Sequence, residues 1–185
     1  MATIIKTYRE SVPARRFIGL RYTDDDRQDG MYAHLWHEWH EEGRFQLLME
    51  NLADHSDTAD QAQMAGHDHE LSDDDTAFIG LMRWQADEPF QYWIGLFAPE
   101  GTDVPNGFES HDFPASDLGV CWIHGHEPEI YKREQDCMQA LEDEDYTIAS
   151  APDGATWFFE RYASPRFTNP DEEGKVILDI CYYIQ

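Results

Sequence analysis

The segment Thr156–Tyr162 reads TWFFERY, in which large side chains occupy both the odd-numbered and the even-numbered positions. Successive side chains of a strand point to opposite faces, so Phe158, Glu160 and Tyr162 share one face. Trp157, Phe159 and Arg161 share the other. The alternation predicts a strand in which the carboxylate of Glu160 lies among aromatic side chains.

A carboxylate in such surroundings is costly unless it is hydrogen-bonded, paired with a cation or available to a cationic ligand, because water solvates its charge better. Glu160 is therefore a candidate site residue. The alternative is a structural role, with Glu160 in a salt bridge to a nearby arginine or at an exposed edge. The sequence leaves both interpretations open.

Six further segments alternate or run apolar in the manner of strands, and two longer segments have apolar residues at helical spacing. The strands are expected at residues 4–8, 17–22, 78–84, 91–97, 118–123 and 176–184. The helical segments are residues 31–52 and a stretch between 123 and 146. Residues 54–75, rich in Asp, His, Ser, Ala and Gly, are expected to form a mobile, solvated loop or a ragged helix end. This order predicts an α+β fold with two helices packed on antiparallel sheet.

The two halves of the chain resemble each other weakly. Val12-Pro13-Ala14 before Ile18-Gly19-Leu20 returns as Phe113-Pro114-Ala115 before Leu118-Gly119-Val120, and each set precedes a helical segment. Leu81-Met82-Arg83-Trp84 likewise matches Phe159-Glu160-Arg161-Tyr162. We expect one domain over residues 1–185, built from duplicated βαββ units at about 1–98 and 107–185, which are related by a pseudo-twofold axis. A ligand groove would lie between them.

The charge and composition of the chain limit the classes of function that it is expected to have. The chain has 185 residues, 13 basic against 38 acidic, and a net charge of −25, which repels phosphate backbones, so direct nucleic-acid binding is not expected. No apolar run reaches the length of a membrane helix, and no signal peptide is evident, so the expected compartment is the cytoplasm. Three cysteines without a CxxC pair are expected to be free and packed.

A second acid, Asp179, interrupts the apolar run of residues 176–181 and is expected to lie near Glu160 if the two strands pair suitably. Trp84 and Trp93 are the repeat counterparts of Tyr162 and Asp179. Aromatic faces attract planar rings and cations, so these residues are candidate walls of the groove. Each of them could equally be ordinary core.

Metal and cofactor chemistry receive little support. His34, His37 and His40 recur within one helical segment, but Trp36 and Trp39 supply its apolar face, which leaves the histidines on polar flanks, and the spacing is not HExxH. A second cluster, His67-Asp68-His69-Glu70, lies in the expected loop. We predict no metal site and no cofactor, and neither a nucleotide-binding glycine loop nor a GxSxG elbow occurs.

In this order, Pro13-Ala14-Arg15-Arg16, Pro99-Glu100-Gly101, Phe113-Pro114-Ala115, His124-Gly125 and Phe159-Glu160-Arg161-Tyr162 resemble the gyrase-inhibitor-like (GyrI-like) small-molecule-binding domain. It is akin to the effector-binding domains of AraC-type and MerR-type multidrug regulators. The resemblance implies a duplicated βαββ fold, a groove for lipophilic cations, and a ligand-binding glutamate that Glu160 matches. It also implies aromatic walls, for which Tyr162 and Trp84 are candidates, and an acid in the last strand that Asp179 matches.

The regulators carry a helix-turn-helix ahead of this domain, whereas this chain starts at its first expected strand, so the resemblance implies a stand-alone domain. Its function is then expected to be binding of a lipophilic, cationic or planar molecule, with sequestration of toxic compounds as one outcome. One alternative is hydrolysis of reactive electrophiles with Glu160 as general base. Another is binding of the acidic surface to a protein partner such as DNA gyrase.

Overall fold

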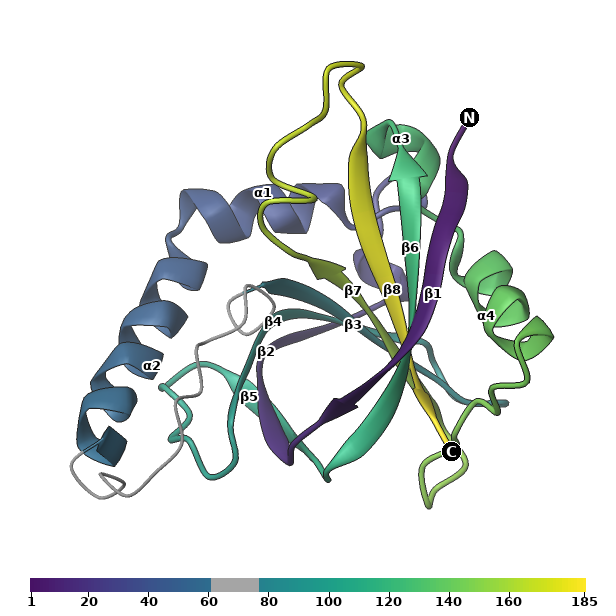
Figure 1. The fold of residues 1–185 in the computed structure, drawn as a ribbon. Coiled ribbons are helices and arrows are strands. Elements are labelled where there is room, and N and C mark those ends of the chain that lie inside the picture. Colours follow the sequence, from purple (N-terminus) through teal and green to yellow (C-terminus); the bar gives the residue numbers. More distant parts are fainter. Residues whose placement is uncertain (61–76) are drawn as a thin grey trace.

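The computed structural model describes residues 1–60 and 77–185 and consists of a single antiparallel sheet with helices on one face (Figure 1). The sheet has eight strands: β1 (Thr3–Val12), β2 (Arg15–Thr23), β3 (Phe78–Trp84), β4 (Gln91–Pro99), β5 (Glu109–Phe113), β6 (Ser116–Gly125), β7 (Thr156–Tyr162) and β8 (Val176–Ile184). The helices are α1 (Ala33–Glu41), α2 (Arg44–Asp60), α3 (Glu127–Ile130) and α4 (Glu134–Asp143), with a 3-10 turn, η1 (Asp24–Asp26).

The strand order, β1-β6-β8-β7-β3-β4-β2-β5, reads the same from either edge if the halves of the chain are exchanged. Strands β3 and β7, the third strand of each half, pair with each other at the centre of the sheet. In this pair Gly80 lies opposite Glu160. At the edges the halves exchange strands, because β1 pairs with β6 and β5 pairs with β2. This arrangement confirms the α+β class and the duplicated, pseudo-twofold architecture.

Several boundaries differ from the sequence-based expectation. Strand β5 was not predicted, because its sequence, ESHDF, is mostly polar and lies at an edge of the sheet. The first helical segment is two helices, because Gly43 has a φ of +66° and this left-handed conformation ends α1. The second segment also divides, into α3 and α4, with Lys132 at a φ of +62° between them. Residues 54–60, expected in a solvated loop or a ragged helix end, continue α2, and residues 61–75 lie outside the described part of the chain.

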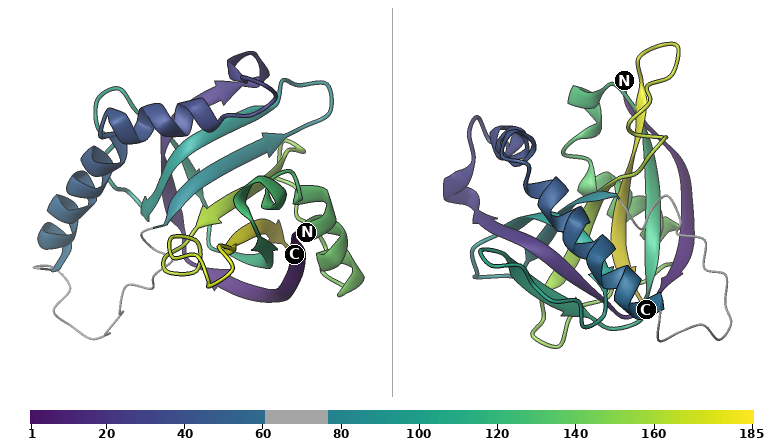
Figure 2. Two further views of the ribbon diagram at one scale, coloured as in Figure 1. Left: turned by 90° about the horizontal axis from the view of Figure 1, so that it is seen from above. Right: turned by 90° about the vertical axis from the view of Figure 1, so that its left-hand side faces the viewer.

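The helices bury one face of the sheet. Helix α2 lies against β4 and α4 lies against β6, so each half contributes its helices to the same face (Figure 2). Trp39 and Leu48 of the first half and Cys137 and Leu141 of the second are buried in one apolar cluster with side chains of the sheet. In the described residues no helix is both long and apolar enough to cross a membrane. The three cysteines are free and buried, as predicted.

The opposite face is buried because the sheet curls over it. Phe113 of the edge strand β5 stacks on Tyr183 of β8, with ring centroids 5.1 Å apart, although four strands lie between β8 and β5 in the sheet order. The short connections from β1 to β2 and from β5 to β6 lie at this end of the molecule (Figure 1). A second apolar cluster, which includes Trp93, Trp157 and Phe159, fills the enclosed space.

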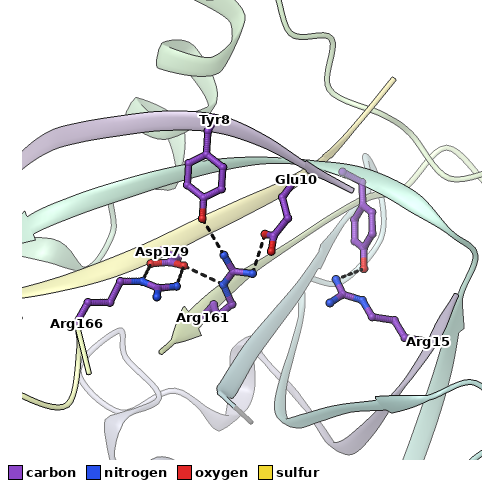
Figure 3. A network of polar contacts seen from close by, with 7 residues as sticks. Tyr8, Glu10, Arg15, Arg161, Arg166 and Asp179 are labelled. Atoms are coloured by element: carbon purple, nitrogen blue, oxygen red, sulfur yellow. Dashed lines mark hydrogen bonds and ion pairs between the residues drawn. The ribbon is translucent and has the colours of Figure 1, made fainter. Parts of the chain in front are cut away.

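Asp179 belongs to this second face and forms a buried ionic network (Figure 3). Its Oδ2 accepts a hydrogen bond from Nε of Arg161 at 2.8 Å, and its Oδ1 accepts one from Nε of Arg166 at 2.7 Å. Arg161 also pairs with Glu10 at 2.9 Å. The prediction that Asp179 lies near Glu160 is wrong, because the β7–β8 register places Asp179 opposite Arg161 and Ile180 opposite Glu160.

Replacement of Asp179 by Asn should destabilise the protein strongly. The substitution leaves Arg161, which is 3% exposed, next to a neutral amide, and breaking a buried ion pair from one side typically costs about 3 kcal/mol or more. Urea denaturation would measure the loss. Asp25→Asn, at an exposed position of η1, serves as the control and should change the unfolding free energy by less than about 0.5 kcal/mol. Equal effects of the two substitutions would contradict the structural role of Asp179.

Candidate functional site

A cavity of about 1160 Å³ opens on the helix-covered face, where the two halves meet. Its floor consists of side chains from the four central strands, and its walls come from the helices and from the loop between β7 and β8. The lining is rich in aromatic residues, which are Tyr32, Trp36, Phe78, Trp84, Phe90, Tyr92, Tyr131, Phe158, Tyr162, Phe167 and Tyr182.

Glu160 lies in the floor of this cavity and is only 6% exposed. Its Oε2 accepts two hydrogen bonds, from the hydroxyl of Tyr162 at 2.9 Å and from the hydroxyl of Tyr92 at 3.1 Å. Within residues 1–60 and 77–185, no donor reaches Oε1. No arginine or lysine forms an ion pair with Glu160 in the same residues, so a structural salt bridge does not account for the buried carboxyl group.

The surroundings of Glu160 favour its protonated form. Burial raises the pKa of Glu160 to about 7, and the nearby negative charge of Glu134 adds to the rise. The hydrogen bonds from Tyr162 and Tyr92 act in the opposite direction, because they stabilise the carboxylate. Burial also holds the pKa of both tyrosines well above 10, so both hydroxyls keep their protons to donate. The group can therefore exchange a proton near neutral pH.

Gly80 provides the space for this arrangement. A Cβ atom at position 80 would lie 2.6 Å from the hydroxyl oxygen of Tyr92 and 2.9 Å from Oε2 of Glu160, both too close. Neither Gly80 nor Tyr92 was predicted from the sequence as a site residue. An isolated glycine inside an apolar strand often marks the close approach of another group, and this signal was present in Phe78–Trp84.

Aromatic contacts fix the triad of Glu160, Tyr92 and Tyr162 from the helix side. The indole N–H of Trp36, on α1, donates to the hydroxyl of Tyr92 at 2.9 Å. Tyr32 stacks on Tyr92 with centroids 4.1 Å apart, and Trp36 packs edge-on against Tyr162 at 4.7 Å. Because these contacts hold both hydroxyls on Oε2, the carboxyl group is presented in one orientation.

The cavity contains some of the predicted ligand-binding residues and not others. Phe158 and Tyr162 line it beside Glu160, as the alternation of β7 requires, and Trp84 lines it at a position 53% exposed to solvent. Trp93 does not line it. It is buried on the opposite face of the sheet with Asp179, because Tyr92 of the same strand faces the cavity.

The repeat match that linked Trp93 with Asp179 was displaced by two residues. In the observed registers Arg83 lies opposite Gln91, and Arg161 lies opposite Asp179. If Arg83 and Arg161 correspond, then Gln91 is the counterpart of Asp179. The assignment of both Trp93 and Asp179 to the groove is therefore corrected by the strand register.

The histidines of α1 do not gather around a common point. His37 contacts Glu41 one turn later at 3.2 Å, and His40 packs on the rings of Phe45 and Phe78. In the described part of the chain no group of three potential ligands is placed to hold a metal ion. The cluster at residues 67–70 lies outside the described residues.

The raised pKa of Glu160 predicts a specific dependence of stability on pH. Between about pH 4.5 and 7 the folded protein holds a proton that the unfolded chain has released, so the free energy of unfolding should fall as pH rises through this window. The expected loss, relative to Glu160→Gln, is about 3 kcal/mol, with no further change above pH 7. Denaturation of both proteins from pH 4 to 8.5 measures it, and parallel curves would contradict the assignment.

No protein-family model matches the chain, and no curated protein matches it in sequence. Solved structures do match. A transcription regulation protein from Staphylococcus aureus MU50 has a TM-score of 0.61 and 16% identity, covering 98% of this chain and 99% of its own. SAV2435 bound to tetraphenylphosphonium has a TM-score of 0.63 and 16% identity, covering 98% of this chain and 94% of its own. The C-terminal domain of EcmrR has a TM-score of 0.57 and 10% identity, covering 97% of each chain.

These similarities extend over nearly the whole length of each compared structure, so they concern the complete duplicated sheet and its helices. The identities of 10–16% limit the comparison to the fold. The chain therefore has the fold of the GyrI-like effector-binding domains, as the sequence resemblance predicted.

Proposed function

We propose that the protein binds a lipophilic organic cation with aromatic rings in the central cavity, with Glu160 as the counter-ion. The observation that carries the proposal is a buried carboxyl group whose Oε1 has no donor, in an aromatic cavity between the two halves. A buried carboxyl group without a cationic partner is costly, and a ligand that supplies the cation removes this cost.

The aromatic walls support the same ligand class. Ring faces attract cations and stack on planar groups, and both interactions gain strength away from water. The stacked pair of Phe158 and Tyr182, with centroids 5.0 Å apart, presents such a surface beside Glu160. The tetraphenylphosphonium in the structure of SAV2435 is an aromatic cation bound by a protein of this fold.

Tetraphenylphosphonium is thus a suitable probe, and its affinity should depend on the charge of Glu160. We expect Glu160→Gln to weaken its binding at pH 8 by about tenfold or more, because a buried charge partner is lost. A neutral analogue, triphenylphosphine oxide, should lose little affinity. Affinity of the wild-type protein for the cation should fall about tenfold from pH 8 to pH 6 as Glu160 takes up its proton, whereas Glu160→Gln should show no such fall.

Titration calorimetry or fluorescence at several pH values gives these constants. Glu172→Gln, an exposed acid outside the cavity, is the matched control and should bind the cation as the wild-type protein does. Equal binding of the cation by wild type and Glu160→Gln at pH 8 would refute the role of Glu160.

Hydrolysis is the second candidate, favoured by one observation. A carboxyl group with a pKa of about 7 and one unoccupied oxygen meets the requirement for a general base at neutral pH. In this function Oε1 of Glu160 would take a proton from a water molecule as the water oxygen bonds to an electrophilic ring carbon of a ligand held by the aromatic walls. The strained ring bond at that carbon would break, and the protonated Glu160 would return the proton to the leaving atom.

Turnover of strained electrophiles distinguishes the two functions. A hydrolase would lose at least about a hundredfold in kcat with Glu160→Gln, while a neutral substrate would still bind, because general-base catalysis contributes to that extent. Product formation followed by mass spectrometry, with Glu172→Gln as control, measures this loss. Unchanged product formation in Glu160→Gln would exclude Glu160 as the base. The gyrase alternative rests on surface charge alone and stays a prediction.

A further inference from the structure

A second carboxylate, Glu134, lines the same cavity from the start of α4. Its side chain is partly buried, and in the described residues no hydrogen bond or ion pair reaches its carboxylate. Its charge contributes to the raised pKa of Glu160, so the two acids act on each other within one cavity. Two like charges in one partly dry space repel each other and together favour positive charge between them.

An aromatic surface connects these two acids. Phe158 lies two residues before Glu160 on the same face of β7, and its ring stacks on Tyr182 at an interplanar angle of 12°. The hydroxyl of Tyr182 donates to the main-chain oxygen of Glu134 at 3.0 Å. The platform formed by Phe158 and Tyr182 therefore contacts the main chain of Glu134 at one side and is continuous with the strand that carries Glu160 at the other.

Among the described residues, the basic side chains of the lining form no ion pair with Glu134 or Glu160. Arg27 pairs with Asp24 at 2.9 Å and donates a hydrogen bond to the hydroxyl of Tyr32 at 3.1 Å, and the negative charge of Glu134 acts on it from farther away. Lys132 is exposed to solvent. A third acid, Glu127, also lines the cavity and accepts a hydrogen bond from Tyr131. The volume of about 1160 Å³ exceeds the range of roughly 300–1,000 Å³ usual for ligand pockets, so the cavity has room for a ligand that extends beyond Glu160.

We infer that Glu134 forms a second cation subsite and that the cavity selects flat aromatic dications, with one charged group at Glu160, the other at Glu134, and the ring system on Phe158 and Tyr182. This inference rests on the proposed function, because it needs the first subsite at Glu160. It goes beyond that function by specifying the number and placement of the charges on the ligand.

Aromatic amidines test the inference, because an amidinium group is planar and donates two hydrogen bonds to a carboxylate. Benzamidine carries one such group, and bis-benzamidines with linkers of increasing length carry two. We expect the best bis-benzamidine to bind the wild-type protein at least about tenfold more tightly than a mono-amidine with the same rings and linker. Calorimetry at pH 8 would measure the affinities.

Variants separate the two subsites. Glu134→Gln should abolish the gain of the bis-amidine and change the affinity for the mono-amidine by less than about twofold. Glu160→Gln should weaken both compounds. Glu142→Gln, on the exposed side of the same helix α4 and outside the cavity lining, is the matched control and should preserve the gain. Thermal unfolding of each variant verifies that the cavity is folded.

The outcomes distinguish this inference from the proposed function. If the mono-amidine binds through Glu160 but no bis-amidine binds more tightly, or if Glu134→Gln weakens both compounds equally, the second subsite is refuted and the proposed function stands. If Glu160→Gln leaves the affinity for the mono-amidine unchanged, the role of Glu160 and the second subsite are both refuted. If neither amidine binds while tetraphenylphosphonium binds through Glu160, the second subsite is refuted and the proposed function stands.

Discussion

The pairing of β3 with β7 is the constraint on which the remaining structure depends. It joins the two halves of the chain at the centre of the sheet and sets Gly80 opposite Glu160. Without a side chain at Gly80, the hydroxyl of Tyr92 reaches the carboxyl group across the strand. One register thus determines the continuity of the sheet, the face on which Glu160 lies and the hydrogen bonds that orient it.

Asp179 and Glu160 are both buried in the sheet but have opposite electrostatic surroundings. Asp179 has a structural role, whereas Glu160 is the proposed binding residue. Asp179 is enclosed with Arg161 and Arg166, so its charge is compensated within the protein. Glu160 receives only the hydroxyl groups of two tyrosines, which orient the carboxyl group but supply no positive charge. The face of the sheet that contains Asp179 is filled by the second apolar cluster, whereas the face that contains Glu160 holds the cavity.

The duplicated fold explains why a cavity of this kind forms at the centre. Each half covers its own three strands with helices, and the central strands, β3 and β7, lie where the two sets of helices diverge. Aromatic side chains line the resulting space, and it receives one acid from the sheet strand β7 and one from the helix α4. A ligand with more than one charged group would use features that neither the sheet nor a single helix provides alone.

The sequence by itself determined the class of the fold, most of the strands and the face of β7 that carries Phe158, Glu160 and Tyr162, because side-chain alternation is a local property of the chain. It also indicated that a carboxylate lay in aromatic surroundings. It did not determine that Asp179 and Trp93 lie away from the cavity, nor that Tyr92, Gly80 and Glu134 lie at it. These placements depend on strand register and on helix packing, which bring together residues far apart in the sequence, and only the tertiary structure decided them.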